Sequence, residues 1–253
     1  MLAQRSHDGP LVVQKSLYPE GDAVCQNIVV HPPGGIVGGD RLSIAATLGA
    51  NSRAQLTTPG AAKWYRSAGA RAAQCAKWTV ADAAVLEWFP LEAIVFDGAI
   101  ADLETTIALS GGAAFIGWDV ICLGRAAAGE RFTHGCLRQR VELRRDGALV
   151  FVERALLEGG ARFLDSPVGL NGAPVWGTLL AAAPKIPDHL LAACRGVSRD
   201  GADVSVTQLP GLLIARYRGA SPEAARAYFV ELWRLVRPAL VGRDAVPPRI
   251  WNT

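Results

Sequence analysis

The chain has 253 residues, of which half are hydrophobic and 19% are charged, and its formal net charge is +3 at pH 7. This composition predicts a large folded core and excludes an intrinsically disordered chain. The arginines are scattered among acids rather than gathered in runs, so we expect neither nucleic acid nor a membrane surface as a partner.

Neither a membrane span nor an export signal is expected. There is no apolar stretch of about 18 residues, and residues 1–10 lack the apolar segment of a signal peptide. An odd number of widely spaced cysteines, with no C-x-x-C pair, predicts reduced thiols and a cytoplasmic protein. The same spacing argues against a zinc or iron–sulfur site.

Alternation of apolar and polar residues dominates the first two thirds of the chain and predicts short β-strands. Turn residues separate these strands, and Asp146-Gly147 is the strongest hairpin signal. No helical crossover is evident between the strands, which favours a sandwich, solenoid or layered sheet over β-α-β units. The expected strands are 26–31, 41–48, 54–58, 74–80, 84–88, 101–109, 113–122, 137–145 and 149–157.

The segment HPPGGIVGGD, residues 31–40, holds four glycines and two prolines. It lacks the Gly-Lys-Ser/Thr ending of a phosphate-binding loop, because Asp40-Arg41 stands there instead. We expect a shaped turn between two strands, with Ile36 and Val37 as its apolar anchor.

The last third of the chain is mixed. A helix is expected at 187–194, a hairpin at 204–218, and a long helix that begins after the cap residue Ser221 and ends at Pro238. The apolar stripe expected on the long helix is Ala224, Ala227, Tyr228, Leu232 and Leu235. The tail at 246–253 is expected to be extended, with Trp251 exposed. Without a linker, residues 1–253 are expected to form one domain, strand-rich over 10–165 and mixed over 166–253.

The sequence contains no nucleophile elbow and no histidine pair with metal-ligand spacing. Acids within apolar stretches are more informative, because an acid there is costly unless it is paired or hydrated. Glu92, Asp97 and Asp119 are the main examples. Either these acids face outward or pair with arginines such as Arg125, or they line an internal polar channel or a weak cation path.

Several long and unusual segments, in order along the chain, resemble the UreD (also called UreH) family of urease accessory proteins. They are HPPGGIVGGD (31–40), LTTPGAAKWYRS (56–67), LEWFPLEAIVFDGA (86–99), IGWDVICLGRAAAGERF (116–132) and PRIWNT (248–253). The resemblance implies a mainly β fold, with stacked sheets or an irregular β-helix-like arrangement, a few helices, the longest near the C-terminus, and a water-filled passage.

The resemblance also implies a non-enzymatic assembly factor. Such a protein forms a complex with UreF and, through UreF, with the GTPase UreG, docks on apo-urease and passes nickel to the urease active site. No tightly bound cofactor is implied, only transient Ni(II). The helix at 221–237 and the tail at 246–253 are our candidate surfaces for UreF.

Five acids match acidic positions of the family's segments: Asp40, Glu92, Asp97, Asp119 and Glu130. Our hypothesis is that some of them contact nickel transiently, since oxygen ligands hold Ni(II) weakly and suit transfer rather than storage. His31 and Cys122 are softer candidates, although each stands alone in the sequence, which favours a packing role. Two alternatives stay open: a hydrolase or lyase that uses Glu92 and Asp97, and a non-catalytic β-rich binding protein.

Overall fold

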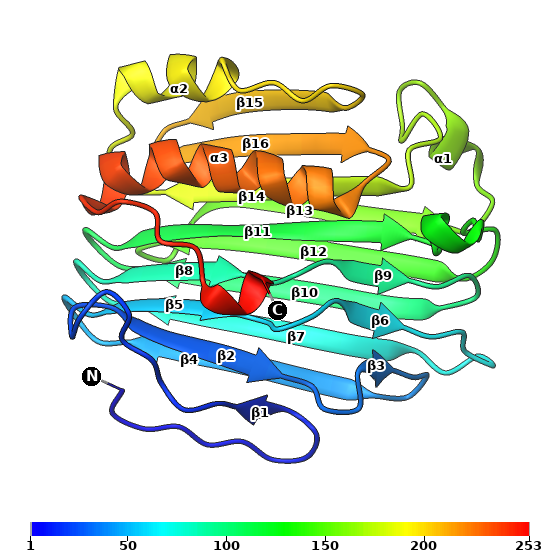
Figure 1. The fold of residues 1–253 in the computed structure, drawn as a ribbon, viewed down its shortest axis with the longest axis horizontal. Coiled ribbons are helices and arrows are strands. Elements are labelled where there is room, and N and C mark those ends of the chain that lie inside the picture. The colour runs from blue at the N-terminus through cyan, green and yellow to red at the C-terminus, as the bar shows by residue number, and fades with distance from the viewer. Residues whose placement is uncertain (1, 253) are drawn as a thin grey trace.

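The structure is a computed structural model that describes residues 2–252. Two β-sheets pack face to face, and one long helix covers the outer face of the larger sheet (Figure 1). The coils stack as in a β-solenoid, so the predicted mainly β, stacked-sheet fold is confirmed.

Within residues 2–252 the larger sheet has eleven strands and the smaller has five. The main path of the larger sheet runs in the order β1 (Val12–Val13), β2 (Cys25–Val30), β5 (Arg53–Thr57), β8 (Val85–Phe89), β11 (Ala114–Leu123), β14 (Val175–Ala182), β16 (Leu212–Gly219) and β15 (Asp203–Leu209). The short strands β3 (Gly35–Ile36), β6 (Ala62–Trp64) and β9 (Ala93–Val95) extend it beside β11. The smaller sheet runs β13 (Ala148–Glu158), β12 (Cys136–Arg145), β10 (Ile100–Leu109), β7 (Ala72–Val80) and β4 (Arg41–Leu48). The helices are η1 (Ala126–Ala128), α1 (Arg162–Asp165), α2 (Asp188–Arg195), α3 (Pro222–Val241) and η2 (Arg249–Asn252).

The parallel strands come from successive coils of the chain, and each coil contributes strands to both sheets. In the larger sheet Cys25 pairs with Ala54, and Leu86 pairs with both Ala54 and Phe115. In the smaller sheet β4, β7, β10 and β12 are likewise parallel neighbours. The chain then reverses direction, and β13, β14, β15 and β16 add antiparallel strands. The coils therefore repeat in structure, although the amino-acid sequence contains no matching repeat.

The predicted strands all lie within one or two residues of observed ones. Alternation predicts the strands of the smaller sheet because each has one face in the core and the other near solvent. In the larger sheet β2, β8 and β11 are buried on both faces and read as short apolar runs. The hairpin between β12 and β13 turns at Asp146 and Gly147, which both have positive φ (49° and 81°), as a type I′ turn requires.

The glycine-rich segment forms two tight turns around the short strand β3. The amide of Gly34 donates to the carbonyl of His31, and the amide of Val37 donates to the carboxylate of Asp40. Ile36 is buried as expected, but Val37 is 49% exposed, so the anchor is one residue rather than two. The predicted shaped turn is confirmed.

Three apolar clusters stabilise the fold. A middle cluster between the sheets contains Trp78 and Trp88, and an end cluster between the same sheets contains Trp64 and Leu137. The helix-side cluster packs α2 and α3 on the larger sheet and contains Phe89, Trp118, Phe229 and Trp233. The candidate functional site lies between the middle and end clusters.

Two predictions about the last third are wrong. The long helix continues through Pro238 to Val241 and ends at Gly242, because burial of Arg237 and Val241 outweighs the lost hydrogen bond at proline. Residues 249–252 of the tail form η2 instead of an extended segment, and Trp251 is half-buried rather than exposed. Its indole nitrogen donates to the hydroxyl of Thr57 at 2.8 Å.

The apolar stripe of α3 was also only partly predicted. Tyr228 and Leu232 are buried, whereas Ala224 and Leu235 are half-buried and Ala227 is exposed. The buried face is made by Ala225, Tyr228, Phe229, Leu232, Trp233, Val236, Arg237 and Val241. Among the described residues, none of the helices is both long and apolar enough to span a membrane.

Candidate functional site

A layer of polar side chains interrupts the apolar interior between the two sheets. On β11, Asp119 lies between Phe115 of the middle cluster and Ile121 of the end cluster. On β12, Gln139 lies in the same way between Leu137 and Val141. We call this the polar layer, and its members are Thr105, Asp119, Gln139, Glu153, Thr178 and Arg216.

Two cavities follow the polar layer. One measures about 20 Å³ and the other about 50 Å³, and they share Trp88, Thr105 and Asp119 in their walls. The smaller cavity also reaches Glu153 and Thr178, whereas the larger also reaches Gln139. A volume of roughly 10–15 Å³ in this measure holds one water. Water and small ions therefore fit along the layer.

Two buried polar atoms in the wall of the larger cavity have no hydrogen-bond partner among residues 2–252. They are the indole nitrogen of Trp64, a residue 1% exposed, and the side-chain oxygen of Gln139, a residue 6% exposed. Buried polar atoms of this kind are normally bonded to ordered water. We infer that the cavity is hydrated.

The carboxylate of Asp119 has no hydrogen-bond or ion-pair partner within residues 2–252. Burial, and next the negative charge of Glu153, raise the pKa of Asp119 to about 6. At neutral pH Asp119 is therefore an ionised carboxylate held at a cost, beside a second carboxylate and facing a hydrated cavity.

The polar layer meets solvent where β16 extends beyond the edge of β13. There a guanidinium nitrogen of Arg216 lies 2.5 Å from a carboxylate oxygen of Glu153, and a second one donates to the hydroxyl of Thr178 at 3.3 Å. The Glu153 side chain is 18% exposed and that of Arg216 is 48% exposed. This ion pair forms the lateral edge of the layer.

Part of the wall of the larger cavity comes from a break in the larger sheet. Residues 58–61 separate β5 from β6, and residues 90–92 separate β8 from β9. Thr58, Pro90 and Leu91 from this sheet break line the cavity. The C-terminal segment crosses the larger sheet toward this region (Figure 1), where Trp251 bonds to Thr57 and packs near Phe89.

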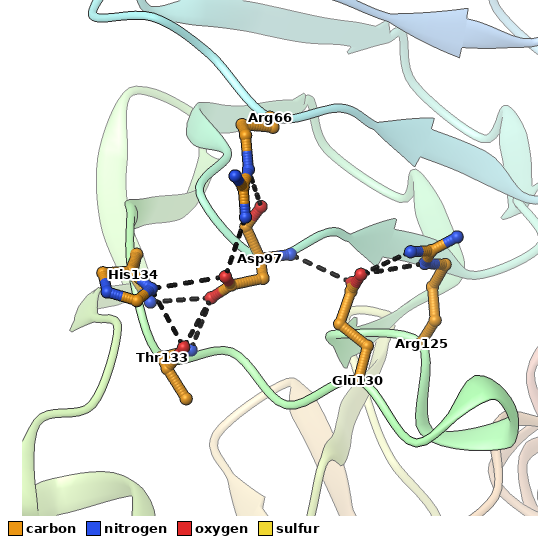
Figure 2. Close-up of polar contacts among 6 residues, drawn as sticks. All are labelled: Arg66, Asp97, Arg125, Glu130, Thr133 and His134. Carbon is orange, nitrogen blue, oxygen red and sulfur yellow. Dashed lines mark hydrogen bonds and ion pairs between the residues drawn. The ribbon is translucent and has the colours of Figure 1, made fainter.

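Asp97 and Glu130 come together in a separate loop cluster (Figure 2). One carboxylate oxygen of Asp97 accepts the backbone amides of Thr133 and His134, each at 2.7 Å. Glu130 accepts the amide of Asp97 at 3.1 Å and pairs with Arg125 at 2.5 Å. These contacts tie the loop after β9 to the loop before β12.

Both acids of this cluster are held ionised. Burial on its own would raise the pKa of Asp97, but hydrogen bonds from His134 and Thr133 outweigh it and lower the pKa to about 2. The Arg125 guanidinium bonded to Glu130 lowers the pKa of that carboxyl. The pairing of Glu130 with Arg125 matches one of the alternatives left open by the sequence.

Replacing Asp97 with asparagine is expected to lower the free energy of unfolding at pH 7 by about 1–2 kcal/mol, because hydrogen bonds to a charged acceptor are lost. The pKa of Asp97 is depressed in the folded state, so its contribution is present above pH 4 and is lost as pH falls toward 2. Urea unfolding at pH 7 and pH 2.5 should show a difference between wild type and variant at pH 7 that shrinks at pH 2.5. An equal difference at both values would contradict the assignment.

The remaining predicted site residues lie apart from one another. Asp40 accepts the amide of Val37 within its turn, and Glu92 faces Arg226 of α3 at 3.9 Å. Burial raises the pKa of Cys122 to about 12, so its thiol is protonated at neutral pH, as suits a packing residue. His31 is half-buried in the glycine-rich turns. Within residues 2–252, no three side chains of His, Cys, Asp or Glu converge as a metal site.

Glu153, Gln139 and Arg216 are residues of the polar layer that the sequence reasoning did not select. A signal was present for Glu153, because it occupies an inward position of β13, two residues after Phe151. No local signal links Arg216 to Asp119, which lies far from it along the chain.

Comparison with known proteins gives one family. The family model described as UreD urease accessory protein matches residues 1–252. The urease accessory protein UreD of Azoarcus sp. (strain BH72) is 55% identical over 253 residues, which covers 100% of this chain and 89% of that protein. The urease accessory protein UreD of Dechloromonas aromatica (strain RCB) is 55% identical over 257 residues, with the same coverage. That of Pseudomonas fluorescens (strain Pf0-1) is 52% identical over 250 residues, covering 99% of this chain and 88% of that protein. With a whole-chain match and identities above half, the chain belongs to the UreD family of urease accessory proteins.

Proposed function

We propose that this protein is a non-catalytic assembly factor that helps to deliver nickel to apo-urease through the polar layer between its sheets. Nickel is the cargo, and it moves along the two cavities past Asp119 and Glu153. UreF, and the GTPase UreG through UreF, are the proposed partners on the donor side, and apo-urease is the acceptor. The protein acts in the cytoplasm, where urease is assembled.

The cavity beside Asp119, with unpartnered polar atoms in its wall, is the observation that carries this proposal. Asp119 lines both cavities, lacks a protein partner among the described residues and lies near Glu153. Asp119 is half-buried on β11, and a partly desolvated carboxylate without a partner carries a cost that a passing cation would offset. Two carboxylates with water bind Ni(II) weakly, which suits passage rather than storage.

The hydrolase or lyase alternative is less well supported. That reaction needs one carboxyl group with a raised pKa as the proton donor. The pKa of Asp97 is instead lowered to about 2, and its oxygens are occupied by Thr133 and His134. Asp97 is therefore a loop-bracing residue rather than a general acid.

Reconstitution of urease from apo-urease, nickel, bicarbonate, UreF and UreG tests the proposal. The double variant Asp119→Asn, Glu153→Gln is expected to lower urease activation about tenfold or more, the size seen when groups that support a metal are removed. The matched control is Asp102→Asn, Glu158→Gln, which removes two carboxylates on β10 and β13 that line neither cavity. The control should activate urease as wild type does.

Size-exclusion chromatography with UreF should show that the double variant still assembles. Normal activation by an assembled Asp119→Asn, Glu153→Gln variant would overturn the passage. A transient role for Asp40, Glu92, Asp97 and Glu130 stays a prediction. For Asp97 and Glu130 the test is Asp97→Asn with Glu130→Gln, which is expected to lower activation while the complex remains assembled.

A further inference from the structure

Arg216 places a permanent positive charge at the lateral edge of the polar layer. On the larger sheet Asp119 pairs in register with Thr178, and Thr178 pairs with Arg216, so the three residues form one row across neighbouring strands. The Arg216 guanidinium reaches from the end of this row to Glu153 of the opposite sheet at 2.5 Å. A guanidinium does not deprotonate in proteins, so its charge persists at any working pH.

The ion pair between Arg216 and Glu153 is weakly held. The Arg216 side chain is 48% exposed, and its second contact, to the hydroxyl of Thr178, is 3.3 Å long. An ion pair that is half in solvent contributes only about 0–1 kcal/mol. The side chain can therefore turn outward into water at little cost, whereas Glu153, at 18% exposed, stays in the layer.

We propose that Arg216 is a tethered counter-ion that neutralises Glu153 while the passage is empty and gives way to a divalent cation. This inference rests on the proposed passage and adds the group that regulates its lateral end. When Arg216 turns away, the carboxylates of Asp119 and Glu153 and the hydroxyl of Thr178 present oxygen donors to the cation. Oxygen donors with water suit Ni(II) in transit and other divalent ions of similar size.

The counter-ion role predicts that Arg216 competes with the metal. Isothermal titration of the isolated protein with NiCl₂ at pH 7.5 measures this directly. Arg216→Gln is expected to bind nickel about fivefold more tightly than wild type, the factor that corresponds to the upper worth of an exposed ion pair. Arg216→Lys keeps the charge and should bind as wild type does. Adding Glu153→Gln to Arg216→Gln should remove the gain.

Arg218→Gln is the matched control, since Arg218 lies on the same strand and pairs with Asp203 at 2.5 Å, and neither residue lines the two cavities of the polar layer. It should leave nickel affinity unchanged, and thermal unfolding should confirm that every variant is folded. Equal or weaker nickel binding by folded Arg216→Gln, or no detectable binding by either protein, would overturn the counter-ion role. So would a gain in affinity that survives Glu153→Gln.

Failure of the passage itself gives a different result. In that case Arg216→Gln would still tighten nickel binding in isolation, but the Asp119→Asn, Glu153→Gln variant would activate urease normally. Conversely, unchanged affinity in Arg216→Gln together with lost activation in the double variant would retain the passage and reject Arg216 as its counter-ion.

Discussion

Replacing Arg237 with alanine is expected to lower the free energy of unfolding by about 3–5 kcal/mol, the usual effect of breaking a buried charge pair. Arg237 is fully buried on α3 and donates to Glu87 on β8 at 2.9 Å and to Glu20 of the N-terminal region at 2.8 Å. Trp233 donates to the same Glu87 carboxylate at 2.7 Å. Without the guanidinium, Glu87 would remain in the interior without a cation, and Glu20 would keep only the longer ion-pair contact to Arg243 at 3.9 Å.

Burial raises the pKa of Glu87, against the opposing effect of Arg237, so losing Arg237 should drive Glu87 toward its protonated form. Urea unfolding at pH 7 measures the effect. Arg234→Ala is the matched control, because Arg234 is exposed on the same helix. It should change stability by less than about 0.5 kcal/mol. Equal effects of the two variants would show that Arg237 does not hold α3 and the N-terminal region on the sheet.

Replacing Asp119 with asparagine is expected to stabilise the protein at pH 7.5 by about 1–3 kcal/mol, although the same change should impair urease activation. The pKa of Asp119 is raised to about 6 in the fold, from an ordinary value of 3.8. Each unit of difference corresponds to about 1.4 kcal/mol, and hydration of the cavity reduces the total. A functional carboxylate kept at a cost to stability is a common trade-off.

The sign of the pH dependence distinguishes this explanation from a simple packing change. Because the folded pKa of Asp119 is raised, its relative contribution to stability is full below pH 4 and is lost as pH rises through 6. The stabilisation by Asp119→Asn should therefore be absent at pH 4 and complete at pH 7.5, as measured by urea unfolding at both values. Asp102→Asn, a third exposed on β10, serves as the control. A loss of stability of equal size at both pH values would contradict the raised pKa.

The strands were predictable because the sequence signals that mark them come from residues close together in the chain. A residue such as Leu42 or Leu143 alternates with polar neighbours, and turn residues such as Asp146 and Gly147 mark where the chain reverses. The end of α3 was not predictable in this way. Proline is a stop signal in sequence, but the contacts of Arg237 and the burial of Val241 carry the helix past Pro238.

The candidate site was only partly predictable. The apolar run around Asp119 marked it as unusual, because an acid there needs a partner or water. The acids Asp97 and Glu130 carried a similar signal, yet the structure binds them to amides and Arg125 in a loop cluster. A sequence pattern shows that a carboxylate lies in an apolar stretch, but it does not show which hydrogen-bond donors or cations bind it in the fold.

The sequence by itself determined the strand-rich class, the main turns, the capped start of α3 and the family. Only the tertiary structure decided that Asp119, Glu153 and Arg216 share one polar layer, and that Trp251 packs beside the sheet break. The physical reason is that propensity and alternation act between near neighbours along the chain, whereas the polar layer is made by stacking coils and by strands added from its last third. Which charges meet there depends on the register of that stacking, which local patterns do not encode.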